Sequence, residues 1–270
     1  MLWNAKNGEI ILGEAKMSYV SFGQGKHTLI LLPGLSDGLT TVQGKALLLA
    51  RPYRSFFQEY TVYMFSRKDD MPECYSIRDM AKDQALAMHT LSIEKACVMG
   101  VSQGGMIAQY LAIDYPDLME KLILAVTAPC VNDLIKSNVT KWMNLAMQGK
   151  HKELMIDTAE KSYSPTYLKK YRKYYPIIGV ISKPANYHRF LVNAKAILEF
   201  DATGELDKIT CPTFIIGGED DKTVGIQASH SLNERITGST LYVYAGLGHA
   251  AYEEAPDFNQ RVSSFLKSEI

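Results

Sequence analysis

Short apolar runs alternate with segments of helical periodicity along the first half of the chain. Strand-sized apolar runs occupy residues 9–12, 16–22, 28–32, 60–65, 96–100 and 122–126. Apolar residues recur at helical spacing over 77–91, behind Ser76 as the N-cap, and again over 106–113. Strands that alternate with helices of this length predict βαβ units and a mostly parallel sheet, and the first two runs, joined at Gly13, predict a leading antiparallel pair.

The alternation stops after residue 127. Residues 131–205 carry helical patterns and no clear strand, and the α/β pattern then resumes with runs at 212–216 and 240–244 and a helical tail. The sequence therefore predicts an α/β core, residues 1–130 and 206–270, interrupted by a helical cap at 131–205. A helical insertion of this kind is a natural lid over a site at the carboxyl edge of the sheet.

The segment Gly100-Val-Ser102-Gln-Gly104 joins the strand at 96–100 to the helix at 106–113. A G-x-S-x-G sequence in this context is typical of a nucleophile elbow, in which a sharp strand-to-helix turn exposes a serine hydroxyl. The turn brings the flanking positions too close to other backbone for side chains, and glycines meet that demand. Ser102 is therefore the candidate nucleophile, and the alternative is a structural Gly-Ser turn.

A serine at its ordinary pKa is a weak nucleophile and needs a base, and an acid that orients the base. In this arrangement the expected chain order is serine, then acid, then histidine. The run at 212–216 is followed by a glycine turn and then Asp220 and Asp221. The run at 240–244 leads through a glycine-rich turn into His249. These candidates all follow strand ends, as the serine does, so they are expected to meet at one edge of one sheet.

Three motifs, Gly100-Val-Ser-Gln-Gly104, Gly218-Glu-Asp-Asp221 and Gly248-His249, match α/β-hydrolase motifs in the order of that family. The chain resembles the family over its whole length apart from the insertion, and is most similar to small cap-bearing esterases, enol-lactonases and aminopeptidase-like members. The resemblance implies Ser102 as nucleophile, His249 as base and Asp221, three residues after the turn glycine, as acid. Asp220 and, after an earlier strand, Asp133 stay open as alternative acids.

An acyl-transfer site also needs fixed N–H donors for the negative charge that develops on the carbonyl oxygen. One donor is expected from the backbone of Gln103, the residue after the nucleophile. The resemblance implies that the other is the backbone N–H of Leu35, in the loop after the 28–32 strand. The usual His-Gly of the family is Pro-Gly in this loop, so another group must brace it, and Ser36 or Asp37 are the candidates.

Tyr163, Tyr167 and Tyr171 recur every four residues within the predicted cap. Ser164 supplies an N-cap and Pro165 the first helical position of this segment, and Pro176 is predicted to end the helix. Two interpretations stay open. The stripe packs the cap helix onto the core, or one or two of its tyrosines line the pocket for the acyl or alcohol part of a substrate.

The charge balance bears on the possible partners. The 270 residues include 29 Lys/Arg and 29 Asp/Glu, so no global basic field favours nucleic acid or an anionic membrane. This total combines an excess of five positive charges in 131–205 with an equal negative excess elsewhere. No apolar run approaches the roughly 18 residues that span a bilayer. The N-terminus lacks a secretory-signal pattern and the four cysteines are scattered, so a cytoplasmic enzyme is expected.

No His/Cys/Asp/Glu cluster has metal-ligand spacing, and the glycine-containing segments at 23–28 and 38–46 lack the full dinucleotide or phosphate-loop patterns. The sequence predicts no metal, no cofactor and a small-molecule acyl substrate; it predicts no oligomeric state. The expected function is a serine hydrolase that cleaves a carboxylic ester, lactone or related substrate through an acyl-serine intermediate. The same triad in a thioesterase, an amidase or peptidase, or a carbon–carbon bond hydrolase is an alternative, as is a slow-turnover ligand-binding protein.

Overall fold

The computed structural model describes residues 2–179 and 183–268. An eight-stranded sheet runs through its centre in the order β1-β2-β4-β3-β5-β6-β7-β8. β1 and β2 form an antiparallel hairpin, β2 pairs antiparallel with β4, and the remaining pairs are parallel, so the predicted mostly parallel sheet is confirmed. The strands are β1 (Lys6–Leu12), β2 (Ala15–Gly23), β3 (His27–Leu32), β4 (Tyr60–Phe65), β5 (Ala96–Val101), β6 (Met119–Ala125), β7 (Thr213–Gly218) and β8 (Thr240–Tyr244).

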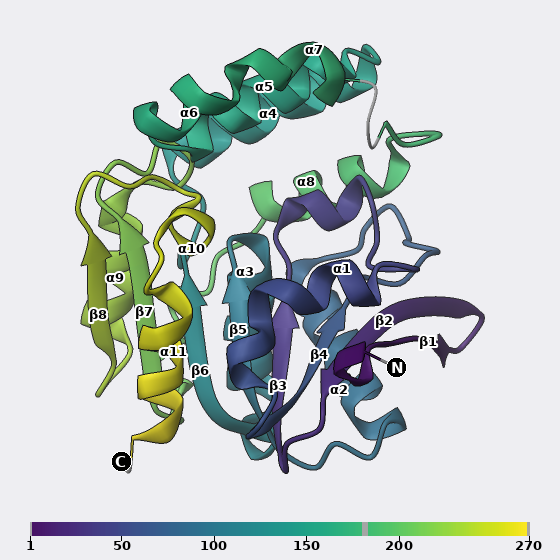
Figure 1. Cartoon of the computed structure of the whole chain (residues 1–270), viewed down its shortest axis with the longest axis vertical. Helices are drawn as coiled ribbons and strands as arrows, with labels where there is room; N and C mark the ends of the chain where they lie inside the picture. The colour runs from purple at the N-terminus through teal and green to yellow at the C-terminus, as the bar shows by residue number, and fades with distance from the viewer. Residues whose placement is uncertain (1, 180–182, 269–270) are drawn as a thin grey trace.

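Helices cover both faces of the sheet (Figure 1). One face packs against α2 (Ile77–Thr90), α3 (Gln103–Asp114) and α9 (Ile226–Arg235). The other packs against α1 (Ala46–Ala50), the 3-10 helix η3 (Arg51–Phe56), α10 (Ala251–Glu254) and α11 (Phe258–Lys267). The sheet therefore separates two apolar cores.

Strand β6 shows why the central strands read as continuous apolar runs. Its successive side chains alternate between the two cores: Leu122 and Leu124 belong to the core of α2 and α3, and Ile123 and Ala125 to the core of α1 and α11. All four are fully buried. A parallel strand with helices on both sides has no face for polar residues, which is why the alternating pattern is absent there.

Between β6 and β7 the chain forms a layer of helices above the carboxyl ends of the parallel strands (Figure 1). These helices are α4 (Asp133–Met147), α5 (His151–Ser162), α6 (Pro165–Tyr171), the 3-10 helix η5 (Arg172–Tyr174), α7 (Tyr175–Ile178) and α8 (His188–Leu198). Helices α4 to α7 lie together at the top, and α8 lies lower, against the core. We call this layer the cap.

Two local predictions have different outcomes. Ser76 is confirmed as the N-cap of α2: its Oγ accepts the N–H of Asp79 at 3.1 Å, and the carboxylate of Asp79 accepts the N–H of Ser76 at 3.0 Å. The prediction that Pro176 ends a helix is wrong. After Tyr171 the chain tightens into η5, and Pro176 lies in the first turn of α7, where the missing N–H of proline would have no intrahelical acceptor in any case.

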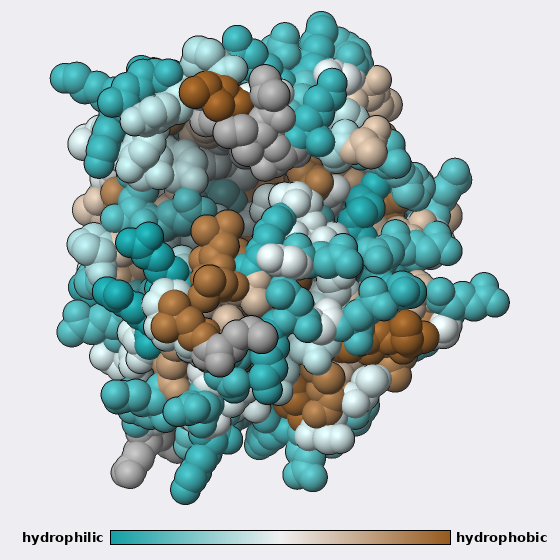
Figure 2. All heavy atoms as spheres, turned by 45° about the vertical axis from the view of Figure 1, so that its right-hand side comes forward, coloured by the Kyte–Doolittle hydropathy of each residue, from teal (hydrophilic) through white to brown (hydrophobic). Residues whose placement is uncertain are grey.

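The surface is mainly hydrophilic, with a few separate hydrophobic clusters (Figure 2). Exposed large apolar side chains include Leu48, at 72% exposure, and Ile11, at 58%. Within the part of the chain that the structure describes, no helix combines the length and the apolar character needed to cross a bilayer.

We expect Leu122→Ala to lower the free energy of unfolding by about 2–5 kcal/mol, because it leaves a cavity where the strand is fully buried. The matched change Leu48→Ala removes the same atoms from an exposed position and should stay within about 0.5 kcal/mol of wild type. Urea denaturation followed by circular dichroism measures both. Equal losses in the two variants would contradict the assignment of Leu122 to the core.

Candidate active site

Ser102 sits at the turn between β5 and α3. Its backbone has φ 53° and ψ −121°, a strained conformation for a residue with a side chain, of the kind that costs about 1–3 kcal/mol and occurs at functional sites. The turn is too tight for side chains at its flanks. A Cβ on Gly104 would lie 1.9 Å from the carbonyl oxygen of Leu32, and one on Gly100 would lie 2.4 Å from that of Gly104. The glycine spacing of the motif is thus a steric requirement of this turn.

His249 and Asp221 lie beside this serine. Nε2 of His249 is 3.0 Å from Oγ of Ser102, and Nδ1 is 2.8 Å from Oδ2 of Asp221. An ionised carboxylate can only accept a hydrogen bond, so the ring donates from Nδ1 and Nε2 is left to accept from the serine hydroxyl. His249 and Asp221 are both buried, at 8% and 7% exposure. This is the hydrogen-bond order that a serine–histidine–acid triad requires.

The environment of Asp221 keeps it ionised. Burial acts to raise the pKa of this carboxyl, but the charge of His249 and the hydrogen bonds from His249 and from two backbone N–H groups outweigh it, and the pKa is lower than usual. Those N–H groups belong to Thr223 and Val224, and they donate to Oδ1 at 2.7 and 2.9 Å. The contacts that depend on the ionised carboxylate therefore persist at neutral pH and are lost only as pH falls through the lowered pKa.

The alternative acids lie elsewhere. Asp220 is exposed, and its backbone N–H donates to the carbonyl of Leu247 at 2.9 Å. Asp133 is exposed in the first turn of α4. Of the three predicted candidates, the structure brings Asp221 to His249.

The two predicted oxyanion donors flank the serine. Gln103 is the first residue of α3, and Leu35 is the first residue of the 3-10 helix η2 (Leu35–Gly38). The backbone at Gly34 passes so close to the serine that a Cβ there would lie 3.3 Å from the Cβ of Ser102. Within residues 2–179 and 183–268, neither the Leu35 nor the Gln103 N–H pairs with an acceptor of the protein. Both are free helix-terminal donors next to Ser102.

A cavity of about 140 Å³ opens at Ser102 and His249. Beyond these two, it is lined by Gly34, Leu35, Ser36, Leu39, Val101, Trp142, Leu154, Met155, Thr158, Ser162, Phe190, Thr223 and Tyr252. Side chains from α4, α5 and α8 of the cap thus complete a wall of the site. Motif analysis did not identify Trp142, Phe190 or Tyr252, because no sequence signal says which face of a helix turns toward a serine distant in the chain.

The predicted pocket tyrosines form a stack beside this cavity rather than part of its lining. The ring centroids of Tyr163 and Tyr167 are 4.4 Å apart, and those of Tyr167 and Tyr171 are 4.1 Å apart. The hydroxyl of Tyr163 donates to Glu253 of α10 at 2.6 Å, which joins the cap to the core. Burial, with the nearby charge of Glu253, raises the pKa of Tyr163, so its hydroxyl stays a donor at neutral pH.

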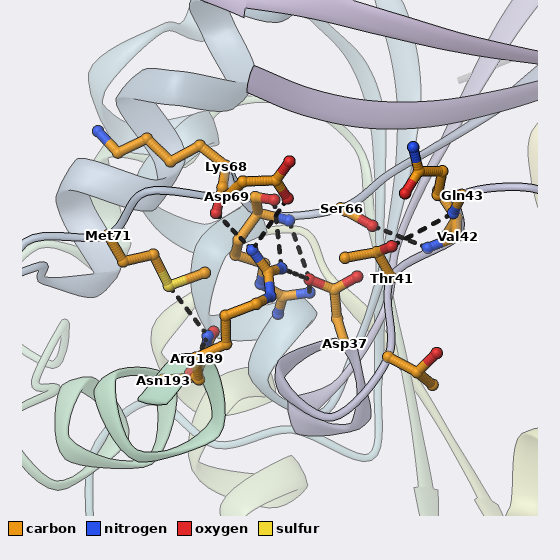
Figure 3. Close-up of polar contacts among 12 residues, drawn as sticks. Asp37, Thr41, Val42, Gln43, Ser66, Lys68, Asp69, Met71, Arg189 and Asn193 are labelled. Carbon is orange, nitrogen blue, oxygen red and sulfur yellow. Dashed lines mark hydrogen bonds and ion pairs between the residues drawn. The ribbon is translucent and has the colours of Figure 1, made fainter. Parts of the chain in front are cut away.

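A buried ionic cluster joins Asp37, which lies in the same loop as Leu35, to Arg67 and Arg189. Figure 3 shows Asp37 and Arg189 in this cluster. Oδ2 of Asp37 accepts the backbone N–H of Arg67 at 2.9 Å and lies 3.8 Å from the Arg67 guanidinium and 3.1 Å from that of Arg189. Asp37 and Arg67 are 2% and 1% exposed. Of the two groups expected to brace this loop, Asp37 occupies the position to do so, whereas Ser36 lines the cavity.

Comparisons with known proteins agree on one family. Residues 63–256 match the family model described as alpha/beta hydrolase fold. A 2-hydroxy-6-oxononadienedioate/2-hydroxy-6-oxononatrienedioate hydrolase from a Pseudomonas species is 29% identical over 201 residues, 70% of each chain. The 3-oxoadipate enol-lactonase 2 of Acinetobacter baylyi is 22% identical over 94% of each chain. Among solved structures, the α/β hydrolase MGS-M2 from a deep-sea metagenome superposes with a TM-score of 0.87 at 19% identity, over 97% of this chain and 98% of that one.

We expect Asp221→Asn to lower kcat by about 10⁴-fold, because an amide opposite Nδ1 favours the wrong histidine tautomer. Asp220→Asn, a matched change at the exposed neighbouring carboxylate, should leave kcat within about 3-fold of wild type. Steady-state kinetics on an activated ester measure both. Comparable losses in the two variants would overturn the choice of Asp221.

Proposed function

The chain belongs to the α/β-hydrolase fold family, and from that premise we propose that it is a serine hydrolase acting on carboxylic esters, lactones or related small acyl compounds. The observation that carries the proposal is the arrangement of Ser102, His249 and Asp221, linked at 3.0 and 2.8 Å beside two free N–H donors. Acyl transfer through a serine needs a base, an acid that orients the base and donors for the oxyanion, and this arrangement supports assigning those roles here.

In the proposed mechanism, Nε2 of His249 takes the proton from Oγ of Ser102 as the oxygen attacks the substrate carbonyl. The N–H groups of Leu35 and Gln103 hold the oxyanion, each contributing about 3–4 kcal/mol if it acts as such donors do elsewhere. Asp221 stabilises the imidazolium that forms. The intermediate collapses as His249 returns the proton to the leaving group, and water then releases the acyl group from Ser102 by the same route.

The proposal also assigns residues 131–205 as a lid. Trp142 of α4, Leu154 of α5 and Phe190 of α8 line the cavity at the serine, so the cap helices supply the surface that a bound acyl group would contact. A lid that closes over the site would exclude water other than the one that attacks the acyl intermediate.

A second reaction with the same triad is supported by the relatives. One is a hydrolase of 2-hydroxy-6-oxononadienedioate and another an enol-lactonase, and an esterase from Exiguobacterium antarcticum shares the fold with a TM-score of 0.77 at 22% identity. Cleavage of a carbon–carbon bond next to a carbonyl uses the same nucleophile and oxyanion donors. Parallel assays on a p-nitrophenyl ester and on a dienoate ring-cleavage product separate the two reactions.

We expect a fluorophosphonate to add one phosphonyl group to the wild-type protein, because it reacts with serines that a histidine activates. Intact-mass spectrometry detects the adduct, and peptide mapping should place it on Ser102. Ser102→Ala should take up none. His249→Ala, which keeps the serine but removes the base, should be labelled at least about 100-fold more slowly.

The same sample separates an enzyme from a ligand-binding protein with a retained triad. A hydrolase should turn over p-nitrophenyl acetate many times per active site, whereas a binding protein should show a single burst and a rise in melting temperature with ligand. A wild-type protein that takes up no fluorophosphonate would overturn the proposed function.

A further inference from the structure

Among the residues that the structure describes, the lining of the cavity at Ser102 contains no lysine, arginine, aspartate or glutamate, and so no cation to pair with a charged substrate group. Trp142, Leu154 and Phe190 make its surface largely apolar, and its polar groups are mainly neutral hydroxyls, including those of Thr158 and Thr223. Bringing a carboxylate into such a surface without a cation or several donors is strongly unfavourable. The chemistry of the cavity therefore favours an uncharged acyl group.

The cations of the cap do not change this conclusion. Arg189 adjoins Phe190 in sequence, but its guanidinium is paired with Asp37 and with the carbonyl of Lys68. Lys161 adjoins a lining residue as well, but its ammonium lies 3.4 Å from Asp157. The basic excess of the cap is thus engaged in ion pairs at the positions closest to the cavity.

Tyr252 ends the cavity on one side. It lies in α10, three residues after His249, and it also lines a second, larger cavity of about 580 Å³. Met99, Tyr167 and Glu253 are among the other residues that line this second cavity. The ring of Tyr252 meets Phe258 edge-on, with centroids 6.4 Å apart. Because Tyr252 lines both spaces, its side chain separates the catalytic cavity from a groove that is partly apolar and includes Glu253.

We propose that the physiological substrates are uncharged esters or lactones with a short acyl group, and that Tyr252 sets the limit on acyl length. The proposal rests on the proposed function and deepens it. The volume of about 140 Å³ at the serine lies well below the 300–1,000 Å³ of sites for drug-sized ligands, whereas the groove beyond Tyr252 lies within that range. Without the tyrosine ring, a longer chain would extend into the groove toward Met99 and Tyr167.

The test is a series of p-nitrophenyl esters with acetyl, butyryl, octanoyl and succinyl acyl groups. For wild type, kcat/KM should fall by about 10-fold or more from butyryl to octanoyl, and the succinyl ester, which carries a carboxylate at butyryl length, should be about 100-fold poorer than butyryl. Tyr252→Ala should raise the octanoyl-to-acetyl ratio by about 10-fold or more. Tyr252→Phe, which keeps the ring, should retain the wild-type profile.

The following outcomes would contradict the proposal. A wild-type protein that prefers octanoyl or succinyl esters, or a Tyr252→Ala variant with an unchanged chain-length profile, would overturn it. A protein that fluorophosphonate labels but that cleaves none of the four esters would overturn the substrate class while leaving Ser102 as the nucleophile. Absence of labelling would instead overturn the proposed function itself.

A second and independent observation concerns the ionic cluster of Asp37, Arg67 and Arg189. Besides contacting Asp37, the buried guanidinium of Arg67 donates from Nη2 to Oε1 of Gln103 at 3.0 Å, and Nε2 of Gln103 donates to the carbonyl of Asn193 at 2.9 Å. One buried cation therefore joins the two segments that carry the N–H donors, the loop at 35–38 and the first residue of α3.

The cluster also reaches the cap. Arg189 and Asn193 both belong to α8, and the amide of Asn193 donates to the carbonyl of Arg189 at 2.8 Å and to the sulfur of Met71 at 3.4 Å (Figure 3). Between these two polar residues the same helix supplies Phe190 to the wall of the catalytic cavity. The position of Phe190 in the cavity wall and the position of the loop at 35–38 thus both depend on the ionic cluster of Asp37, Arg67 and Arg189.

We infer that Asp37, Arg67 and Arg189 are positioning residues that hold the Leu35 and Gln103 N–H groups in place for the oxyanion and couple this geometry to the seating of α8. Asp37 takes the bracing role in a loop that has proline instead of histidine. The cluster acts on the transition state more than on the ground state, because the carbonyl oxygen becomes negative only during the reaction.

Arg189→Met tests the inference, because this side chain is partly exposed and the variant should fold. We expect kcat for p-nitrophenyl acetate to fall by about 10–100-fold with KM changed by less than about 3-fold, below the loss for deleting a whole donor. Affinity for a boronic acid, which forms a tetrahedral anion on the serine, should weaken by the same factor as kcat. Asp37→Asn should act in the same direction, with melting temperature measured in parallel.

Arg78→Met is the matched control, because it removes a guanidinium from another ion cluster, with Asp114 and Glu205. It should leave kcat and boronic acid affinity within about 2-fold of wild type. A folded Arg189→Met variant with unchanged kcat, or one in which KM rises while boronic acid affinity is kept, would overturn the positioning role.

Discussion

The close approach of backbone at the turn between β5 and α3 is the constraint on which the rest of the site depends. Position 104 has room only for a hydrogen, because a Cβ there would lie 1.9 Å from the carbonyl oxygen of Leu32. This contact places the start of α3 directly against the end of β3 and forces the positive φ of Ser102. It also brings the backbone N–H groups of Leu35, which follows β3, and of Gln103, which follows β5, to the same point above the sheet.

Ionic side chains lie around the cavity at Ser102 rather than in its described lining. Among the described residues, the lining of the cavity contains no lysine, arginine, aspartate or glutamate, while the buried Arg67 pairs with Asp37 of the loop that carries Leu35. Burying such ions is costly, and a buried ion pair is weak evidence for stability, so we assign this pair the role of fixing the local geometry. The chain as a whole is neutral, but its charges are unevenly distributed. The basic residues of the cap nearest the site are held in ion pairs, and the cavity at Ser102 is largely apolar.

Much of the fold was predictable because local physics dictates it. The predicted bounds of β4 and β8 coincide with the observed ones, although β8, at the edge of the sheet, is only partly buried, and Ser76 caps the start of α2 as predicted. The cap was less predictable. Its amphipathic helices are recognisable, but the prediction that Pro176 ends a helix is wrong: Pro176 lies in the first turn of α7, where proline fits as well as it does after a helix end.

The sequence by itself determined the sheet, the turn at Ser102 and the order of the candidate triad, since strand patterns, glycine sterics and chain order are all local properties. Only the tertiary structure decided which carboxylate meets His249, since Asp220 and Asp221 differ by one residue but point to solvent and to the imidazole respectively. It also placed the tyrosine stack beside the cavity, put Trp142, Phe190 and Tyr252 in its wall, and joined Asp37 to Arg67 and Arg189. These are contacts between residues 28 to 152 positions apart, and no periodicity in the chain encodes the orientation of one packed element against another.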